Sequence, residues 1–275
     1  MPINYLKKIQ LGDYNEEGYR VEPLDQVASV IEGFYVFRRN LESNNDLIFN
    51  DGFPVLVFLA KAEQSISVHS AEASFKIRGA WASAGAIKNV YVRYNDHTDS
   101  LFIVRFHPGA FYRLFGLTAK YFRSNPVAPF LEIAKSNNFD IERFFESADI
   151  DERISFITSF VATSLKDVDT PEVLQKTLDH IHHIKGRSTV RDITDGAGVN
   201  YKWLERSFLK NIGLLPKEYI QLHRFIHAYM ELHESKEVDL MSVAVANGYY
   251  DSNHFLKDFK TYTGKTPIEY LKYQR

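Results

Sequence analysis

The chain has 275 residues, of which 45% are hydrophobic and 25% charged, a composition typical of a folded protein long enough for two domains. The formal net charge is −2, so bulk charge alone does not indicate a nucleic-acid partner. The absence of cysteine excludes disulfides, thiolate nucleophiles and cysteine-ligated metal sites, and it fits the cytoplasm as the expected location.

The first half of the chain is predicted to be rich in β-strands. Short runs of Val, Ile, Phe and Tyr alternate with polar turn residues, a pattern typical of a β-barrel or sandwich. The expected strands cover residues 31–37, 54–60, 65–68, 89–94 and 101–106. Residues 54–60 form the longest apolar run, which is too short to span a bilayer, so no membrane partner is expected.

Helical spacing replaces the strand pattern after His107. A short helix is expected over residues 110–115, and residues 140–165 carry the apolar stripes of further helix. The latter would either close the first domain or pair with a second copy of itself. A polar segment before Pro171 suggests two domains, residues 1–166 and 167–275, with Thr170 as the N-cap of the next helix.

The second half is predicted to be helical and contains a weak internal repeat. The expected helices cover residues 171–184, 189–195, 200–211, 217–233, 239–246, 251–262 and 267–272. In each copy of the repeat, a short helix leads to a glycine, a turn and a second helix. Gly198 and Gly248 hold equivalent places, and Asn200 and Asp251 are the expected caps of the second helices. This order of elements predicts two helix-turn-helix units joined by a long helix.

These motifs resemble those of the AraC-type transcription regulators. The shared residues are Gly198-Val199-Asn200, Leu204 to Phe208 and Gly213 to Tyr219 in the first unit, and Gly248-Tyr249, Phe255 to Lys260 and Gly264 to Tyr270 in the second. The resemblance implies an α+β protein with a β-rich, barrel-like first domain and an all-α second domain. It also implies a transcription regulator whose recognition helices, about 200–211 and 251–262, read adjacent major grooves of double-stranded DNA.

The resemblance further implies what the first domain does. Such domains sense a small molecule, mediate dimerisation, or both, so an effector and a homodimer contact are expected partners. RNA polymerase is a further partner if the protein is an activator. The sequence contradicts the family pattern at Leu271, where an arginine is common, and this leaves one phosphate contact in doubt.

Polar residues of the two recognition helices are the candidates for DNA contact. They are Tyr201, Lys202, Glu205, Arg206, Lys210, Ser252, Asn253, Leu256, Lys257 and Lys260. Arg206 is the first choice, since a guanidinium binds guanine or phosphate through two hydrogen bonds, and Asn253 suits adenine. Trp203, Leu204 and Phe208 are expected in the core.

Other polar residues give weaker predictions. Trp81, Arg93, Arg105 and His107 are candidates to line a ligand pocket, and otherwise belong to an ordinary barrel interior or surface. His223 and His227 have metal-ligand spacing without a third ligand, so no metal or other cofactor is expected. His180, His182 and His183 are expected to form a polar helix face.

The sequence has no recognisable catalytic motif, and no enzyme activity is expected. The alternative is a small-molecule-binding or enzymatic β-barrel whose helical domain serves protein interaction. Strongly salt-dependent binding to duplex DNA distinguishes the two, because phosphate contacts release counterions.

Overall fold

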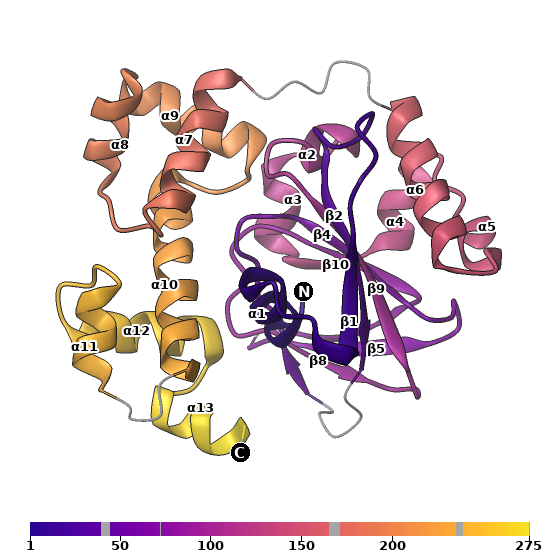
Figure 1. Cartoon of the computed structure of the whole chain (residues 1–275), viewed down its shortest axis with the longest axis horizontal. Helices are drawn as coiled ribbons and strands as arrows, with labels where there is room; N and C mark the ends of the chain where they lie inside the picture. Colours follow the sequence, from indigo (N-terminus) through magenta and orange to yellow (C-terminus); the bar gives the residue numbers. More distant parts are fainter. Residues whose placement is uncertain (40–44, 72, 165–170, 235–238, 275) are drawn as a thin grey trace.

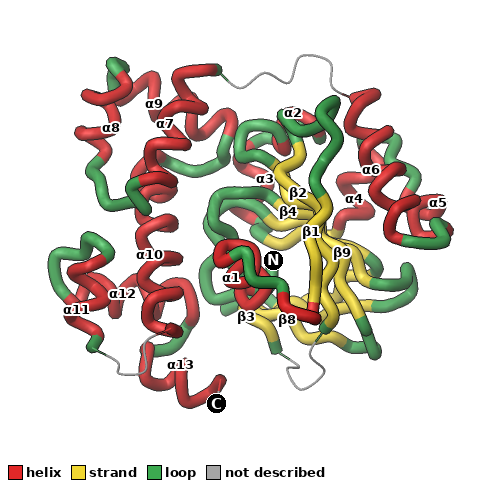
Figure 2. Tube along the Cα trace, viewed as in Figure 1, coloured by secondary structure: helices red, strands yellow, loops and turns green. Residues whose placement is uncertain are grey.

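The computed structural model describes residues 1–275 except 40–44, 72, 165–170, 235–238 and 275 (Figure 1). A β-rich N-terminal part lies beside a helical C-terminal part (Figures 1 and 2), which confirms the predicted α+β class. The expected domain boundary at residue 166 and the expected cap at Thr170 lie outside the described residues.

The strands of the described residues form two antiparallel sheets. They are β1 (Gly18–Val21), β2 (Ile31–Arg38), β3 (Asp46–Leu47), β4 (Val55–Leu59), β5 (Ser65–His69), β6 (Ser74–Arg78), β7 (Ala80–Ser83), β8 (Tyr91–Tyr94), β9 (Ser100–Phe106) and β10 (Val127–Pro129). The larger sheet has the order β1-β2-β9-β4-β7-β10, and the smaller one has the order β3-β8-β5-β6. The chain passes from the smaller to the larger sheet at Gly79, whose φ of +66° is one that glycine adopts without strain.

The larger sheet is covered on both faces. Val57 is in register with both Trp81 and Ile103, so these three side chains share the face that packs toward the smaller sheet. On the opposite face, Phe58 packs against Phe144 of the covering helices, with ring centroids 4.2 Å apart. The helices of this part are α1 (Ile3–Leu11), a 3-10 turn (Asn15–Glu17), α2 (Phe111–Leu114), α3 (Ala119–Ser124), α4 (Phe130–Ser136), α5 (Ile141–Glu146) and α6 (Ile150–Ser164).

The segment 140–165 forms two helices, α5 and α6. The break follows from a cap: the carboxylate of Asp149 accepts the N–H of Glu152, and the carboxylate of Glu152 accepts the N–H of Ala148. Phe144, Ile157 and Val161 are buried against the larger sheet. Of the two expected roles, the structure therefore shows that these helices close the N-terminal part.

The C-terminal part contains the helices that the sequence predicts, each within two residues of the expected bounds. They are α7 (Glu172–His183), α8 (Val190–Ala197), α9 (Tyr201–Asn211), α10 (Pro216–Glu234), α11 (Leu240–Ala246), α12 (Ser252–Thr263) and α13 (Pro267–Gln274). The long helix α10 joins a group around α8 and α9 to a second group around α11 and α12 (Figure 1). Among the described residues, a helix of the length and hydropathy needed to cross a membrane is not found.

Candidate nucleic-acid interface

Helices α8 and α9 form the first helix-turn-helix unit. A capping box starts α8, since Thr189 Oγ1 accepts the N–H of Asp192 and the carboxylate of Asp192 accepts the N–H of Thr189. The helix ends at Gly198, whose φ of +64° lies in the left-handed region. Asn200 Oδ1 then accepts the N–H of Trp203 at 2.9 Å and caps α9. The predicted turn and cap are confirmed.

Helices α11 and α12 repeat this construction. Gly248 has a φ of +78° between them, and the carboxylate of Asp251 accepts the N–H of His254 at 2.9 Å. This hydrogen bond lowers the pKa of Asp251 and keeps the cap ionised at the N-terminus of α12. Phe255 and Phe259, four residues apart, are both buried. The second predicted unit is therefore confirmed as well.

Helix α10 is bonded to both units. On the side of the first unit, Arg224 Nε donates to the carbonyl of Gly186, 3.1 Å away, in the loop before α8. On the side of the second unit, the carboxylate of Asp258 accepts from Gln221 Nε2 at 2.7 Å and from the hydroxyl of Tyr249 at 3.1 Å. Burial raises the pKa of Asp258. At about 1.5 Å per residue, α10 is a strut of about 28 Å that fixes one unit relative to the other.

The predicted contact residues of α9 form an exposed basic row. Lys202, Arg206 and Lys210 are spaced four residues apart, and all three are exposed on one face of the helix. Tyr201, at the first turn, is 49% exposed, whereas Glu205 is half-buried. Of the residues expected in the core, Leu204 and Phe208 are fully buried, and Trp203 is half-buried at the edge of the apolar cluster.

The predicted contact residues of α12 are less uniformly accessible. Asn253, Lys257 and Lys260 are exposed, whereas Ser252 and Leu256 are half-buried. Sequence reasoning missed Tyr250, which is 90% exposed in the turn immediately before the cap. The adjacent Tyr249 is buried, and two neighbouring residues at a turn seldom both point into the core, so Tyr250 is the one that is exposed. That pairing is the signal that would have identified Tyr250.

A groove lies between the two units. It is lined by Ser188, Thr189, Val190, Lys217, Ile220, Gln221, Arg224, Tyr249, His254, Lys257 and Asp258. The start of α8 and the face of α12 that carries Lys257 thus border the same hollow. Lys217, on α10, was not among the predicted contact residues. Lys217, Arg224 and Lys257 therefore place basic side chains along the groove between the two units.

The end of α9 is docked on the β-rich part. Arg113 Nη1, on α2, donates to Asn211 Oδ1 at 3.2 Å. Gly213 lies against the ring of Tyr112, and a Cβ added there would stand 2.3 Å from the Tyr112 hydroxyl oxygen. The φ of Gly213 is +77°, so glycine is required there by both conformation and space.

The end of α12 is docked on the same part of the protein. The backbone N–H of Asn89 donates to the carbonyl of Tyr262 at 2.9 Å, and the hydroxyl of Tyr91 donates to the carbonyl of Thr263 at 2.6 Å. The ring of Phe49 meets that of Tyr262 edge-on, with centroids 5.5 Å apart. The β-rich part therefore holds both recognition helices by their C-terminal ends.

The residues predicted to line a ligand pocket lie in different places. Arg105 is buried, donates through both Nη atoms to the carboxylate of Asp51 at 3.1 and 2.8 Å, and stacks on Phe53. Burial favours a neutral Asp51, but Arg105 overrides it and lowers the pKa of that carboxyl. His107 lies against the same Phe53 ring, with centroids 6.2 Å apart, so the structure brings Arg105 and His107 together.

The other two candidates do not join them. Trp81 is fully buried on β7, and Arg93 is exposed on β8 of the smaller sheet. A ligand role for these four residues stays a prediction.

The expectation of a polar face at His180, His182 and His183 is wrong for His182. His180 and His183 are exposed, but His182 Nε2 lies 2.6 Å from the hydroxyl of Tyr219. Its ring centroid is 4.4 Å from that of His223, because α7 packs between α10 and the β-rich part. Burial lowers the pKa of His182 to about 4, and burial also lowers the pKa of His223 well below its ordinary value. Among the described residues, the His, Asp and Glu side chains form no cluster arranged to hold a metal ion.

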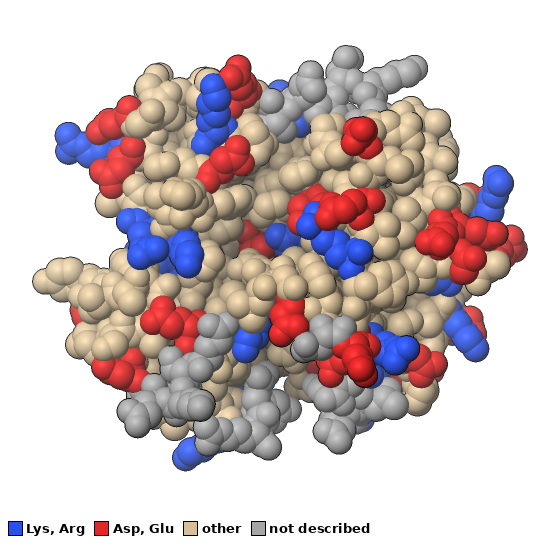
Figure 3. Space-filling view, in the orientation of Figure 1, with Lys and Arg blue, Asp and Glu red and all other residues tan. Residues whose placement is uncertain are grey.

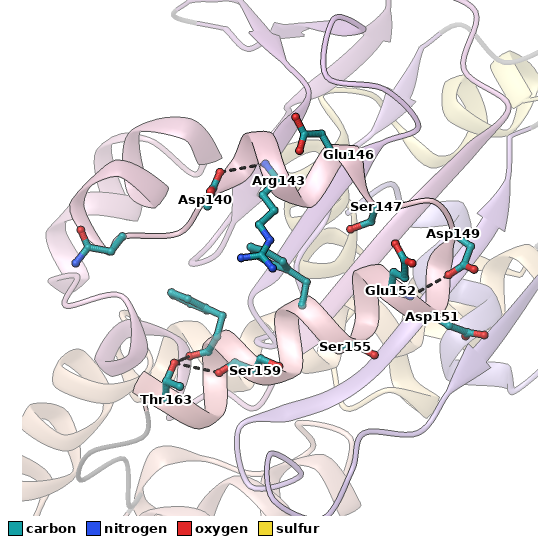
Figure 4. Close-up of a pocket in the computed structure, with 13 residues that line it drawn as sticks. Asp140, Arg143, Glu146, Ser147, Asp149, Asp151, Glu152, Ser155, Ser159 and Thr163 are labelled. Atoms are coloured by element: carbon teal, nitrogen blue, oxygen red, sulfur yellow. Dashed lines mark hydrogen bonds between the residues drawn. The ribbon is translucent and has the colours of Figure 1, made fainter.

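A second groove lies far from the recognition helices, between α5 and α6 (Figure 4). Glu146, Asp149, Asp151 and Glu152 border it, and Arg143 extends from α5 toward α6. Acidic side chains gather over this region at the right of Figure 3. Part of the negative charge of this near-neutral chain is therefore concentrated around α5 and α6, away from the helix-turn-helix units.

Comparison with known proteins gives matches in both halves of the chain. Residues 193–273 match a family model described as a helix-turn-helix domain, and residues 19–128 match a domain of unknown function, DUF6597. No curated protein matches the chain.

Solved structures of similar proteins include examples from three bacteria. ToxT from Vibrio cholerae O395 is 16% identical, over 93% of this chain and 96% of ToxT, with a TM-score of 0.45. The C-terminal domain of the response regulator AraT from Geobacillus stearothermophilus is 20% identical, over 38% of this chain and 88% of that domain, with a TM-score of 0.35. The C-terminal domain of the response regulator yesN from Fusobacterium nucleatum is 24% identical, over 36% and 94%, with a TM-score of 0.31.

The motifs of the sequence, the two capped helix-turn-helix units and the family model that matches residues 193–273 agree with one another. Residues 193–273 therefore form a helix-turn-helix domain, with the motifs that resemble those of the AraC-type transcription regulators.

Proposed function

We propose that the protein regulates transcription by binding a specific DNA sequence with α9 and α12 in adjacent major grooves. The observation that carries the proposal is the pair of equally built helices, each capped at its N-terminus. Helix α10 is hydrogen-bonded to α12 through Asp258 and to the loop before α8 through Gly186. A strut of about 28 Å is of the same order as one turn of B-DNA, about 34 Å. Two helices held in this way suit successive grooves on one face of a duplex.

The exposed residues divide into two kinds of contact. Arg206 and Asn253 have the hydrogen-bonding groups that distinguish guanine and adenine in the major groove. Lys202, Lys210 and Lys257 are exposed cations suited to phosphates. The first pair is expected to set the target sequence, and the lysines are expected to set the affinity and its dependence on salt.

The proposal is tested with the full chain and duplexes selected from a random pool, by fluorescence anisotropy at several salt concentrations. We expect affinity that falls steeply with salt, and we expect Arg206→Ala to relax the preference at one base position with a loss of about 1–3 kcal/mol. Lys135→Ala, an exposed lysine on α4, is the matched control and leaves binding unchanged. Salt-insensitive or undetectable duplex binding rejects the proposal and favours a protein-interaction role for the helices.

The N-terminal part, with the boundary placed between residues 166 and 167, is proposed to bias this binding. The contacts of Arg113 with Asn211 and of Tyr91 with Thr263 support that role, since any shift of the β-rich part moves the ends of both recognition helices. A small-molecule effector or a homodimer contact would act through these contacts. RNA polymerase is the further partner if the protein is an activator.

The bias is tested by weakening one docking contact. Tyr91→Phe removes the hydroxyl that donates to the carbonyl of Thr263, and Tyr121→Phe, on α3 of the same part, is the control. We expect Tyr91→Phe to change the affinity for the selected duplex or its optimal half-site spacing, while the control leaves both unaltered. Light scattering with and without duplex establishes whether a dimer forms.

A further inference from the structure

The groove between the two helix-turn-helix units has one wall on the long helix α10. This wall is a stripe with a spacing of three and four residues, formed by Lys217, Ile220, Gln221 and Arg224. A second wall is a similar stripe of α12, formed by His254, Lys257 and Asp258. The start of α8 lines the groove as well. The strut between the two units therefore also carries part of the surface between them.

Two lysines of this groove, one on each helix, are available for a partner. Lys217 of α10 and Lys257 of α12 are both exposed. Among the residues that the structure describes, neither ammonium group forms an ion pair or a hydrogen bond. A hollow lined by cations raises the local concentration of anions, so the groove attracts phosphates.

The other Arg, Asp or Glu side chains that line the groove are bound within the fold. Arg224 Nε donates to the carbonyl of Gly186 at 3.1 Å. Asp258 is buried, and its carboxylate accepts from Gln221 Nε2 at 2.7 Å and from the hydroxyl of Tyr249 at 3.1 Å. The two lysines thus present their charge to the groove, while its carboxylate is enclosed by its own hydrogen bonds.

The position of Lys217 works against the stability of α10 itself. Pro216 begins the helix, so Lys217 lies in its first turn. The N-terminal end of a helix carries a partial positive charge, which makes a cation unfavourable there and a carboxylate favourable. Glu218 fits this rule and also accepts the N–H of Leu215 at 2.8 Å, whereas Lys217 violates it. A residue that breaks a local rule without a compensating contact indicates a functional role, here the binding of an anion.

We infer that Lys217 and Lys257 bind the sugar–phosphate backbone of the DNA segment that joins the two half-sites, so that α10 is a DNA-binding element as well as a strut. This inference rests on the proposed function. With α9 and α12 in successive major grooves on one face of a duplex, the minor groove and its two flanking backbones face the protein between them. The groove lies between the same two units, so its lysines are close to those phosphates.

This contact predicts a spacer between the half-sites whose phosphates are bound and whose bases are not read. Phosphate contacts fix the register and orientation of a protein on the duplex but carry no sequence information directly. Lys217 is therefore expected to set affinity and its dependence on salt, while Arg206 and Asn253 set the base preference. The two half-sites should be separated by a segment of fixed length and free sequence.

The first test measures the slope of log affinity against log salt for the full chain and a selected duplex. Lys217→Gln and Lys257→Gln each remove one charge from the groove, and Lys135→Gln removes one from the exposed side of α4 as the matched control. We expect the slope to become less steep by about 0.9 for each groove variant and to stay unchanged for the control. Lys217→Arg, which keeps the charge, retains the slope of the unmodified chain. Lys217→Gln removes a cation from the first turn of α10, so it should not destabilise the fold.

The second test locates the phosphate. Single phosphates of the selected duplex are replaced, one at a time, by uncharged methylphosphonates, and each duplex is titrated with the unmodified chain and with Lys217→Gln. Neutralising the phosphate that Lys217 binds should weaken binding by the unmodified chain and leave the variant unaffected. We expect this phosphate in the segment between the half-sites, and we expect Lys257→Gln to identify the same phosphate or its neighbour.

The outcomes separate this inference from the proposed function. Equal slopes for Lys217→Gln and Lys135→Gln overturn the inference, as does a partner phosphate of Lys217 inside either half-site. If Arg206→Ala weakens binding while Lys217→Gln retains the full slope, the inference fails and the proposed function stands. Absence of duplex binding by the unmodified chain is a failure of the proposed function, and the inference fails with it.

Discussion

Tyr219 of α10 packs directly on Gly52 of the β-rich part. A Cβ added to Gly52 would stand 2.3 Å from Cε2 of the Tyr219 ring, and the hydroxyl of the same ring is bound by His182 of α7. The strut between the two helix-turn-helix units thus contacts the turn that follows Asp51, the partner of Arg105. This contact therefore packs α10 of the C-terminal part directly against the β-rich part.

Gly52→Ala is expected to destabilise the protein more than a glycine substitution without a close neighbour. Gly52 has a φ of +96°, so alanine adds backbone strain to the clash with Tyr219. Gly116, whose φ is +59°, has no neighbour within 4 Å of an added Cβ and is the matched control. We expect Gly116→Ala to lower the free energy of unfolding by about 1–2 kcal/mol and Gly52→Ala by about 1–3 kcal/mol more. Urea denaturation measures both, and equal losses contradict the packing described here.

The burial of His182 predicts a loss of stability in mild acid. Burial lowers the pKa of His182 from 6.5 to about 4 in the folded state, so between these values the unfolded chain binds more protons. The free energy of unfolding therefore rises with pH across this window, by up to about 1.4 kcal/mol per pH unit for each such proton, and is lost as pH falls from 6.5 toward 4.

His182→Gln isolates this contribution. Glutamine keeps a hydrogen-bonding group for the hydroxyl of Tyr219 and does not titrate. Urea denaturation between pH 4.5 and pH 7.5, values chosen roughly to bracket the window, is expected to show a shallower pH dependence for this variant. His183→Gln, on the exposed side of α7, should retain the steep dependence. A variant profile parallel to that of the unmodified chain contradicts burial of a neutral His182.

The helix-turn-helix units were predictable because their signals are local. Asn200 and its hydrogen-bond partner Trp203 lie three residues apart, as do Asp251 and His254. Gly198 and Gly248, which have positive φ after the first helices, precede these caps by two and three residues. Hydrophobic spacing of 3.6 residues places each helix, and a cap within one turn sets its start. Bounds within two residues follow from these short-range rules.

The docking surface was not predictable, because its partners are distant in the sequence. Tyr91 and Thr263, which share a hydrogen bond, are 172 residues apart, and neither has a local pattern that marks an interface. In the sequence, nothing distinguishes His182 from His180 and His183. Its burial depends on the packing of α7 against Tyr219, which is 37 residues away.

Strands β1, β3, β6, β7 and β10 were not among the expected strands, and for two of them the cause is clear. β6 is an edge strand with mostly exposed side chains, and β7 is built from small residues around Trp81, so neither shows the alternation of apolar and polar residues that predicts a strand.

Removal of the cap of α9 is expected to destabilise the first unit while Lys202, Arg206 and Lys210 all remain in the sequence. Asn200→Ala loses the hydrogen bond to the N–H of Trp203 and should lower the free energy of unfolding by about 1 kcal/mol. Asn200→Ser keeps a capping oxygen and is the control. Fraying of the first turn also reduces the ordering of Lys202, so duplex affinity should fall for the alanine variant and recover in the serine variant. Equal stability of the two variants in urea is the contrary result.

The buried carboxylate of Asp258 gives a test of the strut itself. Asp258→Ala leaves the amide of Gln221 and the buried hydroxyl of Tyr249 without their acceptor, and we expect a loss of about 1–3 kcal/mol in the free energy of unfolding. Ser207 holds the equivalent place in α9, and Ser207→Ala, with an expected change within about 0.5 kcal/mol, is the matched control. Because Asp258 ties α12 to α10, its loss should also weaken protection of the half-site read by α12 while the half-site read by α9 stays protected. The contrary result is an equal loss of protection over both half-sites in a variant that is still folded. It would show that Asp258 does not act on the α12 unit alone.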